Sequence, residues 1–380
     1  MARSYSLDTL RRYLTLKTHK IYSLPVVILM SHSGCNCRCV MCDIWQGSAN
    51  PRQLAEADVR VLLASLKKLR TRWVVMSGGE ALLNPAFFQL CDLLRSAGLK
   101  VTLLSTGLLL KKYAADVAGY TDEVIVSLDG PPAVHDRIRR VPGAFEKLEA
   151  GVQAVKELVP EFPLSARCVI QRLNYADWPN IVGVARSAGL DQISFLPADV
   201  TSEAFNRLDP WSQERVVEVK LDRSDLPRLG AIIERLLVDH AADFESGFIA
   251  ESPAKIERIY QYYAALQGLA PFPQVRCNAP WVSAVVEADG TIRPCFFHPA
   301  QGHIHTGSLA ETLNGPAAVA FRRRLDLDTD PICRHCVCSL NLRPAVKVGY
   351  EAWPGPGTIC TCIPGHSHPM LTGGPAPGPC

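Results

Sequence analysis

Four cysteines stand close together in the stretch SGCNCRCVMCDIW, and thiols at such spacing can hold iron or zinc. Cys35, Cys37, Cys39 and Cys42 fall within eight positions, too close for all four to form unstrained disulfides with one another. Three of them have the spacing C-x3-C-x2-C. A [4Fe–4S] cluster takes a thiolate on each iron. Three cysteines therefore leave the fourth iron open to another ligand.

A zinc ion is the alternative occupant, because structural zinc prefers four protein ligands in closed tetrahedral geometry. Cys37 could supply the fourth thiolate, so the residue types alone leave zinc and a cluster open. The intervening residue of a C-x3-C-x2-C loop usually points away from the cluster. We therefore interpret Cys37 as a bystander.

The elements that must position this loop alternate between short apolar runs and amphipathic segments. Strand-sized runs rich in Val, Ile and Leu lie at 25–30, 73–77, 100–105, 122–127, 164–170 and 192–197. Helical patterns, such as 54–69 and 144–159, separate them. This alternation predicts a parallel sheet with right-handed crossovers. Periodicity alone does not choose between a partial barrel and an open doubly wound sheet.

Polar motifs stand where the predicted strands end. They are Gly78, Gly79 and Glu80 after the second strand, Ser105, Thr106 and Gly107 after the third, and Ser127 and Asp129 after the fourth. Arg167 stands among apolar residues on the fifth strand and needs an anionic partner. Ligands gather at the carboxyl edge of parallel sheets and barrels, so the sequence predicts a single site at this edge.

The loop CNCRCVMCDIW, directly after a first apolar strand, resembles the cluster-binding loop of the radical S-adenosylmethionine (radical SAM) superfamily. The resemblance implies a partial (β/α)6 barrel of the TIM type, whose [4Fe–4S] cluster is held by Cys35, Cys39 and Cys42. In this family the open iron is chelated by the amino and carboxylate groups of SAM. The reduced cluster then cleaves SAM and releases a 5′-deoxyadenosyl radical.

The resemblance also implies which residues contact SAM. They are Met41, Gly78, Gly79, Glu80, Ser105, Ser127, Asp129 and Arg167. The family's GGE segment binds the SAM amino group, and Arg167 would meet the SAM carboxylate, with a structural salt bridge as the alternative. Met41 stands where the family commonly has an aromatic residue against the adenine. The segment HDRIRR at 135–140 resembles one that is structural or close to the substrate.

A second group of thiols lies near the carboxyl end. Cys277 and Cys295 flank a predicted hairpin over 281–297 with Asp289-Gly290 as its turn. A short helix at 317–325 leads to the run CRHCVC. A zinc ribbon fits four of these cysteines as well as a cluster does.

Behind a radical SAM core, this arrangement resembles the twitch or SPASM extensions, which hold auxiliary [4Fe–4S] clusters. The pattern is shorter than the full SPASM run and implies one auxiliary cluster on Cys277, Cys295, Cys333 and Cys336, with Cys338 as the alternative to Cys336. Cys360 and Cys362 are interpreted as idle thiols, and His298, His303 and His305 as solvated side chains of a polar loop.

Composition and length limit the possible partners and location of the protein and its division into domains. The net charge of +3 gives no argument for nucleic acid or an anionic membrane, and no apolar run approaches the roughly 18–20 residues of a membrane span. We expect a cytoplasmic protein. The predicted division is 1–23 an N-terminal helical extension, 24–198 the core barrel, 199–275 a helical substrate segment, 276–344 the small α+β auxiliary domain and 345–380 a disordered tail.

These features predict a radical SAM enzyme that abstracts hydrogen from its substrate, with a reductase, flavodoxin or ferredoxin as electron donor. About 24 residues precede the first strand, so we expect no leader-peptide-binding domain before the barrel. We therefore expect oxidation or rearrangement of a small molecule in secondary metabolism or cofactor biosynthesis, with maturation of a ribosomal peptide as the alternative. A non-catalytic zinc or iron–sulfur scaffold is the alternative of another class.

Overall fold

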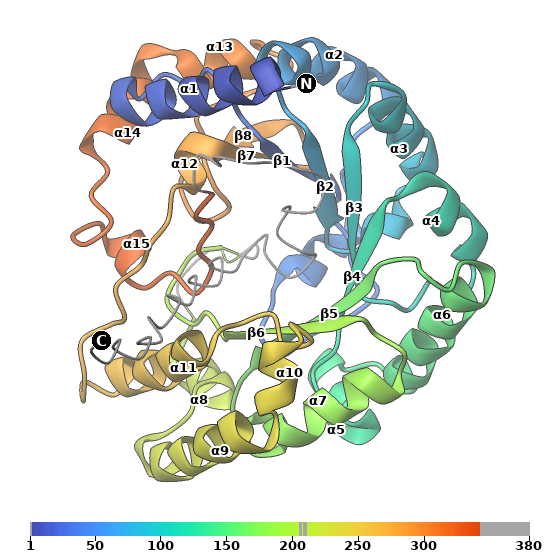
Figure 1. The fold of residues 1–380 in the computed structure, drawn as a ribbon, viewed down its shortest axis with the longest axis vertical. Helices are drawn as coiled ribbons and strands as arrows, with labels where there is room; N and C mark the ends of the chain where they lie inside the picture. The colour runs from blue at the N-terminus through green and yellow to red at the C-terminus, as the bar shows by residue number, and fades with distance from the viewer. Residues whose placement is uncertain (1, 205–206, 208–210, 343–380) are drawn as a thin grey trace, which may run out of the picture.

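A single curved sheet organises the chain in the computed structural model, which describes residues 2–204, 207 and 211–342. The strand order is β6-β5-β4-β3-β2-β1-β7-β8-β9. Strands β1 to β6 and β7 run parallel, and β8 and β9 are antiparallel additions. The sheet curls into an incomplete ring with helices outside it (Figure 1). It is a partial barrel, as the family resemblance implies.

The six predicted strands are confirmed within two residues at each end. They are β1 Val26–His32, β2 Trp73–Gly78, β3 Lys100–Ser105, β4 Glu123–Ser127, β5 Leu164–Ile170 and β6 Gln192–Pro197, and they are followed by β7 Ser283–Val286, β8 Thr291–Arg293 and β9 Gly302–His303. These strands could be predicted from the sequence for a simple reason. Parallel strands are covered on both faces and read as continuous apolar runs.

The helices are α1 Ala2–Thr18, α2 Glu56–Lys68, α3 Phe87–Ser96, α4 Ala114–Tyr120, α5 Pro132–Arg139, α6 Ala144–Leu158, α7 Trp178–Ser187, α8 Gln213–Val219, α9 Leu226–Asp239, α10 Ala241–Glu245, α11 Pro253–Leu266, α12 Ala279–Val282, α13 Leu309–Asn314, α14 Pro316–Arg324 and α15 Pro331–Arg334. The apolar faces of the outer helices bury the convex side of the sheet, so the largest hydrophobic core lies between helices and strands. His240 separates α9 from α10.

A smaller apolar cluster fills the inside of the ring near the amino ends of the strands. Trp73 and Val75 from β2 and Ile125 from β4 pack there with Trp281 from α12. Trp73 also donates from Nε1 to Thr102 Oγ1 at 2.6 Å. This apolar plug lies near the amino ends of β1 and β2, whereas the polar motifs follow the carboxyl ends of the strands.

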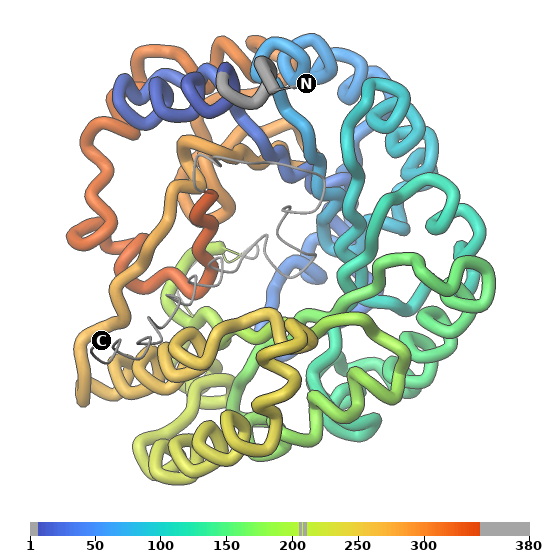
Figure 2. The backbone as a smooth tube through the Cα atoms, in the orientation of Figure 1, coloured from blue at the N-terminus to red at the C-terminus, as the bar shows by residue number. Residues whose placement is uncertain are grey.

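The C-terminal part extends the sheet on its first edge. Strand β7 pairs with β1 in parallel, and β8 returns antiparallel through a turn in which Gly290 has φ +94°. The predicted Asp289-Gly290 hairpin is thus confirmed, although the sequence did not indicate that β7 would join the barrel. The orange and red part of the chain lies along the open side of the ring, between α1 and α11 (Figure 2).

Within the described residues, no helix is both long and apolar enough to cross a membrane. Residues 343–380 lie outside the described part, together with the predicted tail and Cys360 and Cys362.

The core gives a direct stability prediction. Leu103 on β3 is fully buried in the main cluster, and truncation to alanine removes apolar contacts and leaves a cavity. We expect Leu103→Ala to lower the free energy of unfolding by about 2–5 kcal/mol, measured as a fall in melting temperature. Val238→Ala on α9 is the control, because that side chain is 75% exposed. Equal melting temperatures for the two variants would contradict the described core.

Candidate active site

The cysteine loop follows β1 and is held by backbone hydrogen bonds on two sides. The pairing of β1 with β2 shifts register between Met30 and His32, which turns the chain out of the sheet. On one side Gly79 N donates to His32 O and Glu80 N donates to Gly34 O, both at 2.9 Å. On the other side Arg38 N donates to Arg139 O at 3.0 Å. The loop therefore has a fixed place at the carboxyl edge.

The paired glycines are required by this close approach. A Cβ on Gly78 would lie 2.2 Å from His32 O, and one on Gly79 would lie 2.2 Å from Gly34 O. Gly78 also has φ +151°, which an L side chain rarely adopts. The overlapping atoms belong to the backbone, which cannot move aside as a flexible side chain can. No other residue therefore fits at these two positions without displacing the cysteine loop.

Glu80 is fully buried and links three strand ends. Its carboxylate accepts from Ser105 Oγ at 3.0 Å, from Thr106 N at 2.7 Å and from Thr106 Oγ1 at 2.6 Å. The Thr106 hydroxyl also lies 3.0 Å from Asn36 Oδ1, in the cysteine loop. Burial raises the pKa of Glu80, and these hydrogen bonds oppose that rise. The GGE and STG motifs thus form one network beneath the loop, while a direct contact of Glu80 with SAM stays a prediction.

Asp129 and Arg139 form a buried ion pair against a cluster cysteine. Arg139 Nη2 lies 2.6 Å from Asp129 Oδ2, and Arg139 Nη1 lies 3.4 Å from Cys39 Sγ. The hydrogen bond from Cys37 and the charge of Arg139 lower the pKa of Cys39 to about 6 against the effect of burial. A thiolate is the form that binds iron. Sequence analysis missed this role of Arg139, although the HDRIRR segment that contains it stood out.

The remaining predicted SAM contacts lie on the inner side of the same edge. Ser127 is opposite Arg167 in the β4–β5 register, and Arg167 Nε donates to Ser194 Oγ on β6 at 3.4 Å. Met41 packs beside an apolar cluster that contains Val200 and Val219. These positions agree with a site for SAM, and the individual contacts stay predictions.

The loop thiols are not all gathered around one point, although Cys37 hydrogen-bonds both Cys35 and Cys39. Among the described residues, only His298, Asp330 and Cys333 place three ligand atoms within 4.8 Å of one another. No three of the four loop cysteines do so. Four thiolates around one zinc ion at about 2.3 Å would have to converge more closely, whereas the irons of a cluster separate their ligands.

The second group of thiols also comes together. Burial raises the pKa of Cys295 to about 12, and the nearby Cys277 thiol adds to that rise. Charges on Cys277, Cys295 and Cys333 likewise contribute to the raised pKa of Cys336. Cys336 Sγ lies 2.5 Å from the backbone oxygen of Cys338. The proposed ligand set of Cys277, Cys295, Cys333 and Cys336 is therefore gathered at one place.

The expectation of solvated histidines is wrong for His298. This side chain is 2% exposed, and its Nε2 lies 3.3 Å from Cys333 Sγ. The sequence did contain a hint of this position. His298 follows Cys295 by three residues, so the two side chains belong to the same short loop. His303 is half-buried, and His305 is exposed and pairs with Asp58.

A cavity of about 830 Å³ extends from residues that flank the cysteine loop to Cys336 of the second thiol group. His32 and Gly79 at the strand ends line one part of it, and Phe296, His335 and Cys336 line another. The further charged lining residues are Arg52, Asp199, Glu203, Arg207, Glu287, Asp289 and Arg293. Many of these charges are paired inside the protein, as Arg207 is with Asp199 at 3.1 Å. The cavity has the size of a small-molecule site, and its wall combines charged with apolar side chains.

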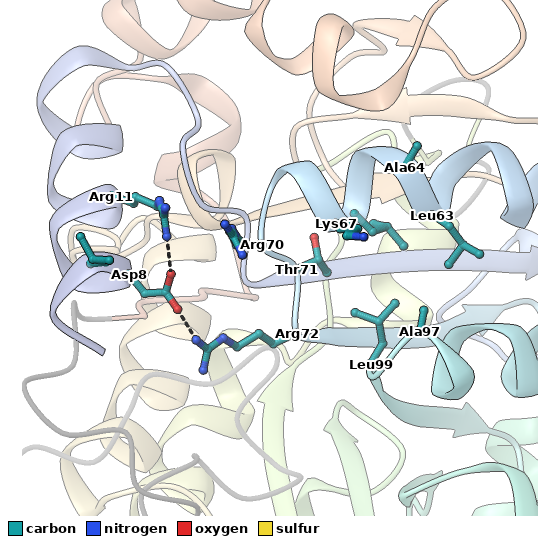
Figure 3. Close-up of a pocket in the computed structure, with 12 residues that line it drawn as sticks. Asp8, Arg11, Leu63, Ala64, Lys67, Arg70, Thr71, Arg72, Ala97 and Leu99 are labelled. Atoms are coloured by element: carbon teal, nitrogen blue, oxygen red, sulfur yellow. Dashed lines mark hydrogen bonds and ion pairs between the residues drawn. The ribbon is translucent and has the colours of Figure 1, made fainter. Parts of the chain in front are cut away.

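Another pocket, of about 690 Å³, lies at the opposite edge, between α1, α2 and the starts of β2 and β3. Figure 3 shows Asp8 between Arg11 and Arg72, with an ion pair to each. This pocket contains none of the predicted site residues and lies beyond the apolar plug of the barrel.

Comparison with protein families identifies both halves of the site. Residues 30–184 match the model of the radical SAM superfamily, and residues 277–337 match the SPASM iron–sulfur cluster-binding domain. The chain therefore contains a radical SAM domain followed by a SPASM domain. These two domains imply SAM and [4Fe–4S] clusters as cofactors. The thiol groups, the buried cation beside Cys39 and the cavity between them fit these cofactors.

The relatives of this radical SAM protein act on different substrates. The chain is 26% identical to the AdoMet-dependent heme synthase of Methanosarcina barkeri over 49% of this chain and 54% of that protein. It is 23% identical to the sporulation killing factor maturation protein SkfB of Bacillus subtilis over 83% and 69%. The chain spans about half the length of the first curated relatives it matches.

A solved structure confirms the fold of the radical SAM chain. SuiB of Streptococcus suis bound to S-adenosylmethionine aligns with a TM-score of 0.59, covering 86% of this chain and 75% of that one at 14% identity. At this identity the likeness shows the fold alone.

The glycine contact predicts an effect on iron binding. A methyl group on Gly79 would overlap Gly34 O and displace the cysteine loop. We expect Gly79→Ala to lose most of the iron of the SAM-binding cluster after anaerobic reconstitution, measured by iron analysis. Gly183→Ala on α7 is the control, because nothing lies within 4 Å of its added Cβ. Full iron content in Gly79→Ala would show that the loop is not fixed by this contact.

The buried ion pair predicts a coupling between two positions. Arg139→Met leaves the fully buried Asp129 carboxylate unpaired, which should destabilise the protein by about 3–5 kcal/mol. The double variant Arg139→Met/Asp129→Asn should recover much of this loss, because no buried charge remains. Denaturant unfolding of all three variants checks this. Additive effects of the two substitutions would contradict the pair.

Proposed function

We propose that the protein oxidises or rearranges a small polar molecule in the cavity between its two cluster sites, in secondary metabolism or cofactor biosynthesis. The observation that carries this proposal is the 830 Å³ cavity, which has the cysteine-loop edge on one side and Cys336 on the other. A substrate held there would face both cofactors. When bound, SAM at the reduced cluster supplies the radical that abstracts hydrogen from the substrate.

The residues of the chain supply position, charge and exclusion of water. Glu80 with Ser105 and Thr106 fixes the shape of the edge, and Arg139 holds Cys39 in the thiolate form. Asp199 and Arg207 form a buried ion pair in the cavity wall. Charged groups that are already fixed in place can orient a polar substrate without having to reorganise during the reaction.

For an oxidation, one hydrogen atom leaves the substrate to form 5′-deoxyadenosine. The remaining substrate radical then loses one electron and one proton. A cluster held by Cys277, Cys295, Cys333 and Cys336 would be able to accept that electron, because Cys336 lines the cavity. A flavodoxin or ferredoxin would supply the electron that starts each turnover. Cluster chemistry of this kind needs a reducing compartment, in agreement with the predicted cytoplasmic location.

Peptide maturation is a second candidate. It is favoured by the relative SkfB, a maturation protein by name, which matches 83% of this chain. The charged cavity would then receive one side chain of a peptide rather than a whole molecule.

The loop cysteines test the chemistry. Anaerobically reconstituted protein with dithionite and SAM should form 5′-deoxyadenosine, measured by chromatography and mass spectrometry. Cys39→Ser should abolish this product, whereas the matched variant Cys37→Ser should keep most of it, because Cys37 holds no iron in this account. Nucleoside formation by Cys39→Ser, or its absence in the unsubstituted protein with full iron, would refute the proposed function.

The auxiliary cysteines test the oxidation. Cys333→Ser should still cleave SAM but fail to complete product, because the substrate radical has no electron acceptor. The substrate class can be found with extract from host cells grown in heavy water, separated into a low-molecular-weight and a peptide fraction. Deuterium in 5′-deoxyadenosine with the first fraction supports the small-molecule proposal. Deuterium only with the second fraction supports the peptide maturase.

A further inference from the structure

His298 is a buried polar side chain to which the proposed function gives no task. It follows β8 in the loop of Cys295 and is 2% exposed. Its ring meets Phe321 of α14 edge to face, with the ring centroids 5.0 Å apart. Packing of this kind fixes the plane of the imidazole. Nε2 is thereby directed at the Cys333 thiol, 3.3 Å away.

The neighbouring carboxylate does not compete for Nε2. Asp330 Oδ1 lies 3.9 Å from Nε2, beyond hydrogen-bond distance. The same oxygen accepts from the backbone N–H groups of Ile332 at 3.0 Å and Cys333 at 2.9 Å. Asp330 thus fixes the backbone of Cys333 and also hydrogen-bonds its thiol, while Nε2 of His298 contacts the same sulfur.

His298 contacts two cysteines of the auxiliary set. Its ring meets Cys333, and its backbone N–H, like that of Phe297, hydrogen-bonds the Cys295 thiol and opposes the rise of that thiol's pKa. A neutral imidazole has one N–H donor, and the tautomer with the proton on Nε2 can donate to a thiolate.

The distance favours a hydrogen bond over iron ligation by the ring. Ligands of one cluster bind different irons and stand apart, whereas Nε2 and Cys333 Sγ are 3.3 Å apart. His298, Asp330 and Cys333 are close enough to share one metal ion. That arrangement would take Cys333 out of the set with Cys277, Cys295 and Cys336. If His298 instead donates a hydrogen bond to Cys333, all four thiols remain ligands of the cluster.

We propose that His298 is a positioning residue of the auxiliary cluster, whose Nε2–H donates to the Cys333 thiolate and raises the reduction potential of that cluster. Hydrogen bonds to ligand sulfur stabilise the more negative, reduced state, and they are one of the determinants of cluster potential. This inference rests on the proposed function, in which the auxiliary cluster accepts one electron from the substrate radical. A higher potential makes that acceptance more favourable.

The test isolates the auxiliary cluster in the full chain. The triple variant Cys35→Ala/Cys39→Ala/Cys42→Ala is reconstituted anaerobically, and its midpoint potential is measured by redox titration monitored by electron paramagnetic resonance. In this background His298→Leu should lower the potential, because the donor is lost. His298→Gln should stay closer to the unsubstituted potential, because its amide can donate from a similar place. His305→Leu is the control, since His305 is exposed, and should leave the potential unchanged.

Three results would overturn the proposal. The first is a midpoint potential in His298→Leu, with full auxiliary iron, that equals the potential before this substitution. Both His298 variants could lose the auxiliary iron, which would make the residue structural. Pulsed resonance of the unsubstituted site could show the strong nitrogen coupling of a directly bound imidazole. Failure of the proposed function would be seen elsewhere, as full iron content without 5′-deoxyadenosine, and would leave the measured potentials unaffected.

Discussion

The close backbone contact between the cysteine loop and the end of β2 is the constraint on which the rest of the structure depends. Gly78 and Gly79 allow it, because a side chain at either position would overlap a carbonyl oxygen of residues 32–34. Once the two segments touch, Glu80 reaches the end of β3 and Asn36 lies beside Thr106. Three strand ends and the thiol loop then form one rigid edge, and a cluster held there has a fixed orientation toward the cavity.

The two thiol groups differ in the partners of their cysteines. At the SAM-binding loop a permanent cation, Arg139, lies against Cys39 and is balanced by buried Asp129. At the auxiliary site a neutral imidazole, His298, lies against Cys333. Both groups stabilise negative charge on a ligand sulfur, Arg139 through its positive charge and His298 through a ring N–H.

Sequence reasoning predicted the parts of the molecule that local patterns determine. Buried parallel strands leave long apolar runs, so the six core strands were found within two residues. The C-x3-C-x2-C spacing and the motifs after each strand can also be recognised in the sequence alone. What tertiary contact determines was missed. Nothing local shows that β7 pairs with β1, that Arg139 meets Cys39 across a hundred positions, or that His298 is buried.

The central claim is that Cys35, Cys39 and Cys42 hold a cluster whose fourth iron binds SAM. The most direct measurement is electron–nuclear double resonance on the reduced, reconstituted protein mixed with SAM labelled with nitrogen-15 in its amino group. The account predicts a coupling between that nitrogen and the cluster, unchanged in Cys37→Ser. No coupling in protein with full iron, or a cluster already ligated by Cys37, would contradict it.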